Sequence, residues 1–309
     1  MTYAPPPEEV VLEYFTSLSN VGRWGPDDEL GTMNFVTPAK VVEAARLVVS
    51  GRVVSVGQDL DTEPSAKNRN KPVELTMMAK GTGPGEPPAC AERIAYLPHG
   101  PQVTHLDSVT HVFFEGKMWN GKDAVDHVHD DGMDFGSVYA LRNGIVTRGV
   151  LLDVARARGV DYLPNLEYVT VDDFEAAEAM EGVRVGTGDA LLVRTGLGAR
   201  EAVEGPEDGS FAQGRTGLSP ETVKWMYERE VCLFSADCTE RMPSPYERVT
   251  LPLHQVASAA VGLNLVDHAA VEELARACVE ERRWEFLYTV APLRIPKSTG
   301  SAVNPLCIF

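Results

Sequence analysis

Histidine and aspartate residues are concentrated in one stretch of this chain, PHGPQVTHLDSVTHVFFEGKMWNG, residues 98–121. Three of the seven histidines, His99, His105 and His111, fall within it, together with Asp107. His105 and Asp107 are two residues apart, so on a strand their side chains point to the same face. Imidazole and carboxylate groups on one face suit a divalent metal ion of the zinc or manganese kind. The alternative is a half-buried strand whose polar groups bond only to the protein.

His111 lies four residues beyond Asp107. On a continuous strand it would stay on the same face, but about 13 Å further along at about 3.3 Å per residue. One ion cannot bind both side chains across that distance. We therefore expect a bend or bulge after Ser108 that brings His111 beside the metal rather than onto it.

Two other groups of side chains are candidates for binding. Trp24 lies in a loop rich in turn formers, and Phe113 and Trp119 follow the histidine stretch. Any of these aromatic rings could face a flat substrate, although such rings more often pack the core or hold a loop against it. His127 and His129 have metal-like spacing among aspartates, but we interpret that segment as a solvated loop.

Composition narrows the class of protein. The chain has 309 residues, 44% hydrophobic and 24% charged, as in a globular protein with a sizeable core. Its net charge of -17 argues against nucleic acid and anionic membranes as partners. Five cysteines without a C-x-x-C pair, and an N-terminus without signal-peptide features, predict a cytoplasmic protein.

The elements that must position these residues alternate between strands and helices. We predict a helix at residues 8–18 and another that begins with Thr37 as N-cap and Pro38 at its first position and runs to Ser50. Further segments are expected as strands (52–60, 74–80, 149–154, 190–195, 231–236, 285–291 and 302–308) and as helices (170–180, 219–230, 254–261 and 271–283). The pattern predicts a single α/β domain over residues 1–309, with a mixed sheet and helices packed around it. Residues 1–20 form a helical extension, and residues 61–92 a long loop that could act as a lid.

The central stretch resembles the metal-dependent cyclase family, which includes bacterial kynurenine formamidase and isatin hydrolase. Thr104, His105, Asp107 and His111 match four positions of the family motif H-x-G-T-H-x-D-x-P-x-H. Pro101 replaces the first histidine, and His99, two residues earlier, could supply the missing ligand. Segments that look like the family, among them LPLHQVASAAVGLNLVDH, cover most of the chain from about residue 20 onward.

This resemblance implies a fold with a swivelling β/β/α core and a site of known chemistry. His99, His105, Asp107, His254 and Asp267 are then the candidate ligands of zinc or manganese, and His111 the catalytic histidine. His254 could instead be a buried structural residue, and Asp267 could cap the following helix. The implied reaction is hydrolysis of an amide or lactam C–N bond in a small substrate, with His111 as general base and then general acid.

Two alternatives remain open. The protein could be a metal-dependent cyclase or dehydratase, or it could be a non-catalytic small-molecule-binding protein, which the loss of the first ligand at Pro101 favours. The resemblance also implies a homo-oligomer, a dimer or tetramer. The apolar C-terminal segment, residues 302–309, is a candidate interface strand because an apolar terminus would otherwise be exposed.

Overall fold

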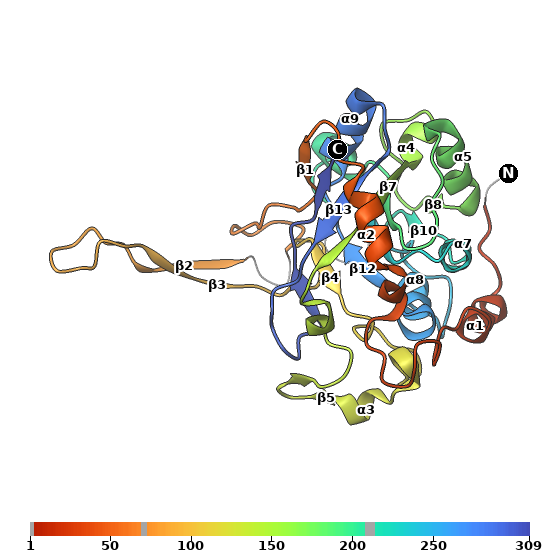
Figure 1. Cartoon of the computed structure of the whole chain (residues 1–309), viewed down its shortest axis with the longest axis horizontal. Coiled ribbons are helices and arrows are strands. Elements are labelled where there is room, and N and C mark those ends of the chain that lie inside the picture. Colours follow the sequence, from red (N-terminus) through yellow and green to blue (C-terminus); the bar gives the residue numbers. More distant parts are fainter. Residues whose placement is uncertain (1–2, 69–72, 208–213) are drawn as a thin grey trace.

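The computed structural model describes residues 3–68, 73–207 and 214–309. Its centre is a nine-stranded sheet in the order β1-β15-β13-β7-β9-β11-β12-β4-β14 (Figure 1). These strands are β1 (Val53–Ser55), β4 (His105–Asp107), β7 (Ile145–Asp153), β9 (Ala190–Arg194), β11 (Leu233–Ala236), β12 (Asn264–Asp267), β13 (Glu285–Val290), β14 (Gly300–Ala302) and β15 (Leu306–Ile308). The strands from β7 to β12 in this order are parallel, and the others pair antiparallel. The predicted α/β class with a mixed sheet is confirmed.

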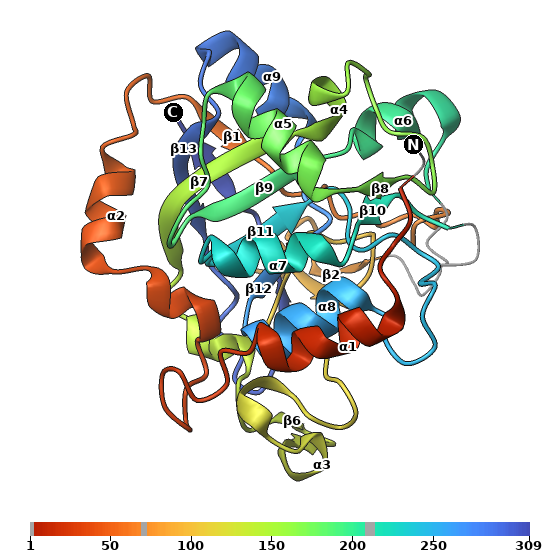
Figure 2. The same ribbon diagram turned by 90° about the vertical axis from the view of Figure 1, so that its right-hand side faces the viewer.

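Both faces of the sheet are buried, which explains the continuous apolar runs of the parallel strands. Leu191 and Val193 of β9 belong to one hydrophobic cluster, while Ala190 and Leu192 belong to the other. The first cluster includes side chains of α1 (Glu8–Ser17), α5 (Val171–Glu181), α7 (Glu221–Glu228) and α8 (Pro252–Val256). In Figure 2 these four helices lie on the side of the sheet that faces the viewer. The second includes side chains of α9 (Glu272–Glu281). The remaining helices are α2 (Pro38–Ala45), α3 (Ala124–His127), α4 (Val154–Ala157) and α6 (Leu197–Glu204).

The sheet is strongly curled, so that its two ends approach each other. Only residues 303–305 separate edge strand β14 from β15. In the strand order, β15 is the neighbour of β1, the edge strand at the other end of the sheet. The backbone N–H of Val303 donates to Thr104, and that of Val56 donates to Pro305. The C-terminal segment is therefore an internal strand between β1 and β13, and Cys307 and Phe309 are fully buried. Our interpretation of this segment as a free interface strand was wrong, because the sheet itself buries its apolar side chains.

Local sequence signals mark several helix starts correctly. The Thr37 hydroxyl accepts from Lys40 N, and Thr170 and Asp173 form the capping box that begins α5. Two predicted elements are shorter than expected: α2 ends at Ala45 rather than Ser50, and β1 covers only Val53–Ser55 of residues 52–60. Helix α1 is not a loose extension, because Val11 and Tyr14 lie in the hydrophobic core.

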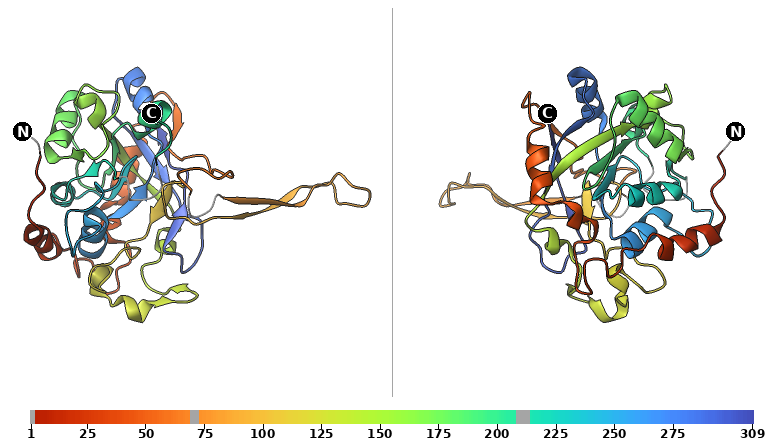
Figure 3. Two further views of the ribbon diagram at one scale, coloured as in Figure 1. Left: turned by 180° about the vertical axis from the view of Figure 1, so that it is seen from behind. Right: turned by 45° about the vertical axis from the view of Figure 1, so that its right-hand side comes forward.

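The segment expected as a long loop contains a two-stranded arm. Strands β2 (Glu74–Ala79) and β3 (Ala91–Ala95) pair antiparallel with each other and join no other strand of the described part of the chain. The ribbon projects far from the body (Figures 1 and 3). Part of the predicted loop, residues 69–72, lies outside the described residues. Two further small sheets pair β5 (Val128–His129) with β6 (Gly132–Met133), and β8 (Tyr168–Val169) with β10 (Gly217–Leu218).

Among the described residues, no helix is both long and apolar enough to cross a membrane.

Candidate metal centre

Strand β4 lies inside the sheet and carries the central pair of side chains. It is bonded to β12 on one side and β14 on the other, which holds its backbone rigidly. His105 and Asp107 point to one face, whereas Leu106 between them is buried in the second hydrophobic cluster. The His105 Nδ1–H donates to the Val103 carbonyl at 2.8 Å, so Nε2 is left free to face Asp107, 3.5 Å away. The strand period predicted from the sequence is therefore present.

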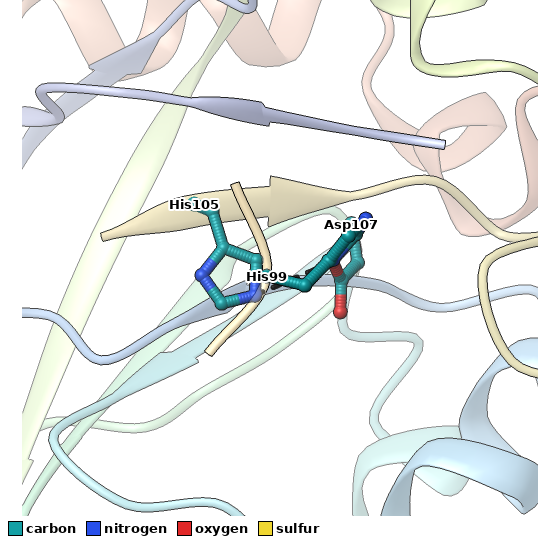
Figure 4. Close-up of side chains that lie close together, drawn as sticks. All are labelled: His99, His105 and Asp107. Carbon is teal, nitrogen blue, oxygen red and sulfur yellow. Dashed lines mark ion pairs between the residues drawn. The ribbon is translucent and has the colours of Figure 1, made fainter. Parts of the chain in front are cut away.

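His99 reaches the same place from the segment that follows the arm. Its Nδ1 atom lies 2.8 Å from Asp107 Oδ1 (Figure 4). Its other ring nitrogen, Nε2, is 3.1 Å from the Thr299 hydroxyl. His99, His105 and Asp107 each offer a ligand atom, and these atoms lie within 4.8 Å of one another. The structure thus brings His99 to the pair on β4, although Pro101 occupies the position of the family's first histidine.

A second group shares Asp107. Asp267, at the end of β12, is the register partner of His105 on β4, and His254 approaches from α8. His254 Nε2 lies 2.9 Å from Asp267 Oδ2 and 3.9 Å from Asp107 Oδ2. Asp107, His254 and Asp267 also place ligand atoms within 4.8 Å of one another. Asp267 does not cap the following helix, since the N-cap of α9 is Val271.

The donor atoms fit a metal ion. Asp107 Oδ2 and Asp267 Oδ1 are buried oxygen atoms without a hydrogen-bond partner among the described residues, and His99 Nδ1 faces only Asp107 Oδ1. Buried polar atoms are normally satisfied, so carboxylate oxygens that converge here without a donor have the chemistry to bind a cation. Two ligand atoms bound to one tetrahedral zinc ion at about 2.0–2.2 Å lie roughly 3.4 Å apart, comparable with the separations found here.

The charges of the site favour ionised carboxylates. Burial alone would raise the pKa of Asp107, but His111, His105 and His99 together hold the pKa below its ordinary value. Burial likewise opposes ionisation of Asp267, and His254 lowers its pKa. His254 shows the opposite result: burial would lower its pKa, yet Glu240 and Asp267 raise the pKa well above the ordinary value.

His111 lies beside the ligands rather than among them. The backbone N–H of His111 donates to the Ser108 carbonyl, and this bond forms the expected turn directly after β4. The His111 ring stacks on His99 with ring centres 3.6 Å apart and planes 3° apart. His111 belongs to neither group of candidate ligands. Burial lowers the pKa of His111 to about 4, against the opposing charge of Asp107.

All these side chains line one cavity of about 180 Å³. Three further lining residues were missed by the sequence reading: Glu240, His268 and Arg215. Glu240 Oε2 lies 2.7 Å from His254 Nδ1, an arrangement that orients a metal-binding histidine. His268 follows Asp267 directly, and burial lowers its pKa to about 3. The sequence predicted no binding role for His268, although it adjoins the candidate ligand Asp267. No local signal marked Glu240 or Arg215.

The three predicted substrate-binding aromatic residues do not line this cavity. Trp119 is fully buried, and its indole N–H donates to the Asp28 carbonyl, so it is a core residue. Trp24 packs against Trp119 and Phe35. Trp24 and Trp119 therefore pack against each other, which is the alternative to substrate binding that the sequence left open. Phe113 is 42% exposed beside the lining residue Val112, and its binding role stays a prediction.

The second pair of histidines is separate from the centre. His127 and His129 both bond to the Asp134 carboxylate, at 2.8 and 3.0 Å. The segment lies at the surface, as expected, but it is a short helix, α3, followed by the β5–β6 hairpin rather than a loop.

A family model described as "Putative cyclase" matches residues 59–240. A solved structure of a novel cyclase is similar over 95% of this chain and 100% of its own, with 28% identity and a TM-score of 0.83. Isatin hydrolase A from Ralstonia solanacearum matches 87% of this chain and 95% of its own, with 21% identity and a TM-score of 0.60. Isatin hydrolase A from Labrenzia aggregata, bound to benzyl benzoate, covers 87% of this chain and 97% of its own, at 19% identity and a TM-score of 0.58. No curated protein sequence matches significantly.

Proposed function

Because this chain belongs to the Cyclase family, we propose that it is a metal-dependent hydrolase. It cleaves an amide or lactam C–N bond in a small aromatic or cyclic substrate. The observation that carries the proposal is the convergence of two groups of histidine and aspartate ligand atoms, which share Asp107, on one cavity. All five cysteines are free, which supports action in the reducing cytoplasm.

His99, His105 and Asp107 would hold one divalent ion, zinc or manganese, and Asp107, His254 and Asp267 a second. Asp107 belongs to both groups and would therefore be a ligand in either of them. Such ions supply a Lewis acid for the substrate carbonyl and lower the pKa of a water molecule to about 7. Mixed imidazole and carboxylate donors suit both zinc and manganese.

His111 is the proposed acid–base residue. Its ring lines the cavity and stacks on His99, so it is held beside the reacting atoms without being a ligand. Burial keeps the pKa of His111 low, which leaves the imidazole neutral and able to accept a proton. His111 would take this proton from the water that forms the new C–O bond and pass it to the leaving nitrogen as the C–N bond breaks.

Arg215 would bind the acid that cleavage produces. It is the only arginine or lysine among the described residues lining the cavity, and it forms an ion pair with Glu207 at 3.2 Å. Hydrolysis of an amide or lactam releases a carboxylate, and a guanidinium has the planar donor geometry that carboxylates prefer.

The two alternatives differ in their support. The non-catalytic binder was suggested by Pro101 in place of a histidine, but the structure places His99 against Asp107, so that argument loses its force. A cyclase or dehydratase would use the same ligands, with the metal as Lewis acid, and only the products distinguish it from the hydrolase.

The test is metal content combined with turnover. Protein purified without chelator and supplied with zinc or manganese should bind the metal and consume cyclic amides or N-formyl aromatic amines, followed by absorbance. Asp107→Asn should fold but lose the metal and the activity, because an amide oxygen carries no charge. Asp134→Asn, outside the cavity, is the matched control and should retain both. A wild-type protein that binds neither metal, or an Asp107→Asn variant with full metal content, would overturn the proposal.

A further inference from the structure

His268 lines the cavity of the candidate metal centre, but the reaction proposed above gives it no role. It is only 7% exposed, and it belongs to neither group of candidate ligands. Among the described residues its hydrogen bonds are those of its backbone, and neither ring nitrogen takes part in one. Buried polar groups are normally bonded, so this imidazole has the chemistry to bind a molecule that enters the cavity.

The backbone of His268 is fixed without the help of its ring. The residue has a φ of 55°, in the left-handed region that is costly for a residue with a Cβ atom. Its carbonyl accepts hydrogen bonds from Thr104 Oγ1 and Gln58 Nε2, both at 2.7 Å. Glycine would suit this conformation better, so the turn itself does not require an imidazole. Strained positions of this kind cluster at active sites.

His268 and His111 lie against different ligands of the first group. The ring centre of His268 is 6.1 Å from that of His105, with the ring planes 30° apart. The His111 ring stacks instead on His99. A substrate at the ligand groups can therefore meet these two histidines with different parts of its structure.

Two other hydrogen-bond donors share a wall of the cavity with His268. Arg215, Thr239 and His268 line both this cavity and a smaller adjoining one. A guanidinium, a hydroxyl and an imidazole can each donate to an oxygen atom. Other lining residues, such as Val112 and Leu251, have no polar side chain. The wall that contains His268 is therefore suited to the oxygen atoms of a substrate or of a product acid.

We propose that His268 is a further catalytic residue, which donates a ring N–H to the carbonyl oxygen of the scissile amide. The proposal rests on the hydrolase function proposed above, because that oxygen becomes negatively charged when water adds and ends in the carboxylate of the product. A neutral imidazole always keeps one N–H, and a donor aimed at such an oxygen stabilises the transition state. The acyl half of the substrate then lies against His268 and Arg215, and the leaving nitrogen lies toward His111.

Acetate binding tests this donor without any turnover. Acetate has the carboxylate that product acids share, and its dissociation constant for the zinc-loaded protein can be measured from its methyl NMR signal. His268→Gly should keep the circular dichroism spectrum and zinc content of the wild type, while acetate binds roughly tenfold more weakly. A wild type that does not bind acetate, equal acetate affinities in the two proteins, or loss of zinc from His268→Gly would overturn the proposal.

Two conservative variants locate the donor nitrogen. His268→Asn places an amide nitrogen near the position of Nδ1, and His268→Gln places one near that of Nε2. One of the two should restore the acetate affinity to within about threefold of the wild type. Arg282→Gly is the matched control, because Arg282 is exposed, has a φ of 53° and does not line the cavity. If neither conservative variant restores binding, the ring acts by its shape and the donor role is rejected.

Turnover separates this proposal from the hydrolase function. With a cyclic amide or N-formyl aromatic amine that the wild type consumes, the kcat of His268→Gly should fall by a factor of roughly 10²–10³ at unchanged zinc content. An unchanged kcat would overturn the catalytic role of His268. A wild type that consumes none of these compounds contradicts the hydrolase function instead, and acetate binding still decides whether His268 is a donor.

Discussion

Gly300 lies directly against the imidazole of His99. A Cβ atom at position 300 would lie 2.4 Å from His99 Cε1 and 2.8 Å from Nε2. Gly300 is on β14, which pairs with β4 in such a way that Gly300 is opposite Asp107. The edge strand β14 thus holds the His99 ring beside the Asp107 carboxylate. Only a residue without a side chain fits at position 300.

Replacement of Gly300 by alanine should therefore weaken metal binding. The added methyl group must displace the His99 ring, and we expect the affinity for zinc to fall by roughly 10–100-fold, as for other disturbed ligand orientations. Competition with a chromophoric chelator measures the affinity. Gly186→Ala is the control, because a Cβ there meets only Asp189 at 4.0 Å. An unchanged affinity in Gly300→Ala would show that His99 is not a ligand.

Alanine at His111 and at His105 should have different effects. His111→Ala should keep its metal while the rate falls by roughly 10²–10⁴, the usual contribution of a positioned acid–base group. His105→Ala should lose metal and rate together, because His105 belongs to a ligand group and His111 does not. Metal analysis and turnover on both proteins decide the matter. Equal metal loss in the two variants would make His111 a ligand.

Glu240 should act on the metal through His254. Its carboxylate bonds to Nδ1 of His254 and fixes the ring so that Nε2 faces the aspartates. Glu240→Ala should lower metal affinity by roughly 10–100-fold. Glu240→Gln keeps an acceptor oxygen and should restore most of the loss. If alanine and glutamine variants bind metal as the wild type does, Glu240 has no orienting role.

Glu181 gives a prediction for stability against pH. Burial raises the pKa of this carboxyl to about 8 in the folded chain, from 4.5. The folded state therefore retains a proton that the unfolded state has lost, and stability falls as pH rises from about 5 to 8. Glu181→Gln should remove this dependence and stabilise the protein at pH 8 by roughly 1–3 kcal/mol. Denaturant unfolding at pH 5 and pH 8 measures it. A wild type whose stability relative to Glu181→Gln does not change between these pH values would contradict the prediction.

Local sequence was sufficient to predict the features that backbone geometry alone determines, namely the faces of a strand and the starts of helices. The period of a strand places His105 and Asp107 on one face and Leu106 on the other, whatever the rest of the chain does. Thr37 and Thr170 mark helix starts because their hydroxyls bond to backbone N–H groups three residues away. The apolar runs of β7 and β9 indicate strands buried on both faces.

Tertiary structure alone decided how the centre is completed. Asp267 reaches His105 because β12 and β4 pair across about half of the chain, and pairing of that kind depends on burial in the whole sheet rather than on local pattern. The folded chain also buries the C-terminal segment as an internal strand of the sheet and Trp119 as a core residue. The side chains of the arm stay exposed. Residue types in the sequence indicate which side chains can bind a metal, but only the folded chain brings His99, Glu240 and Asp267 to one cavity.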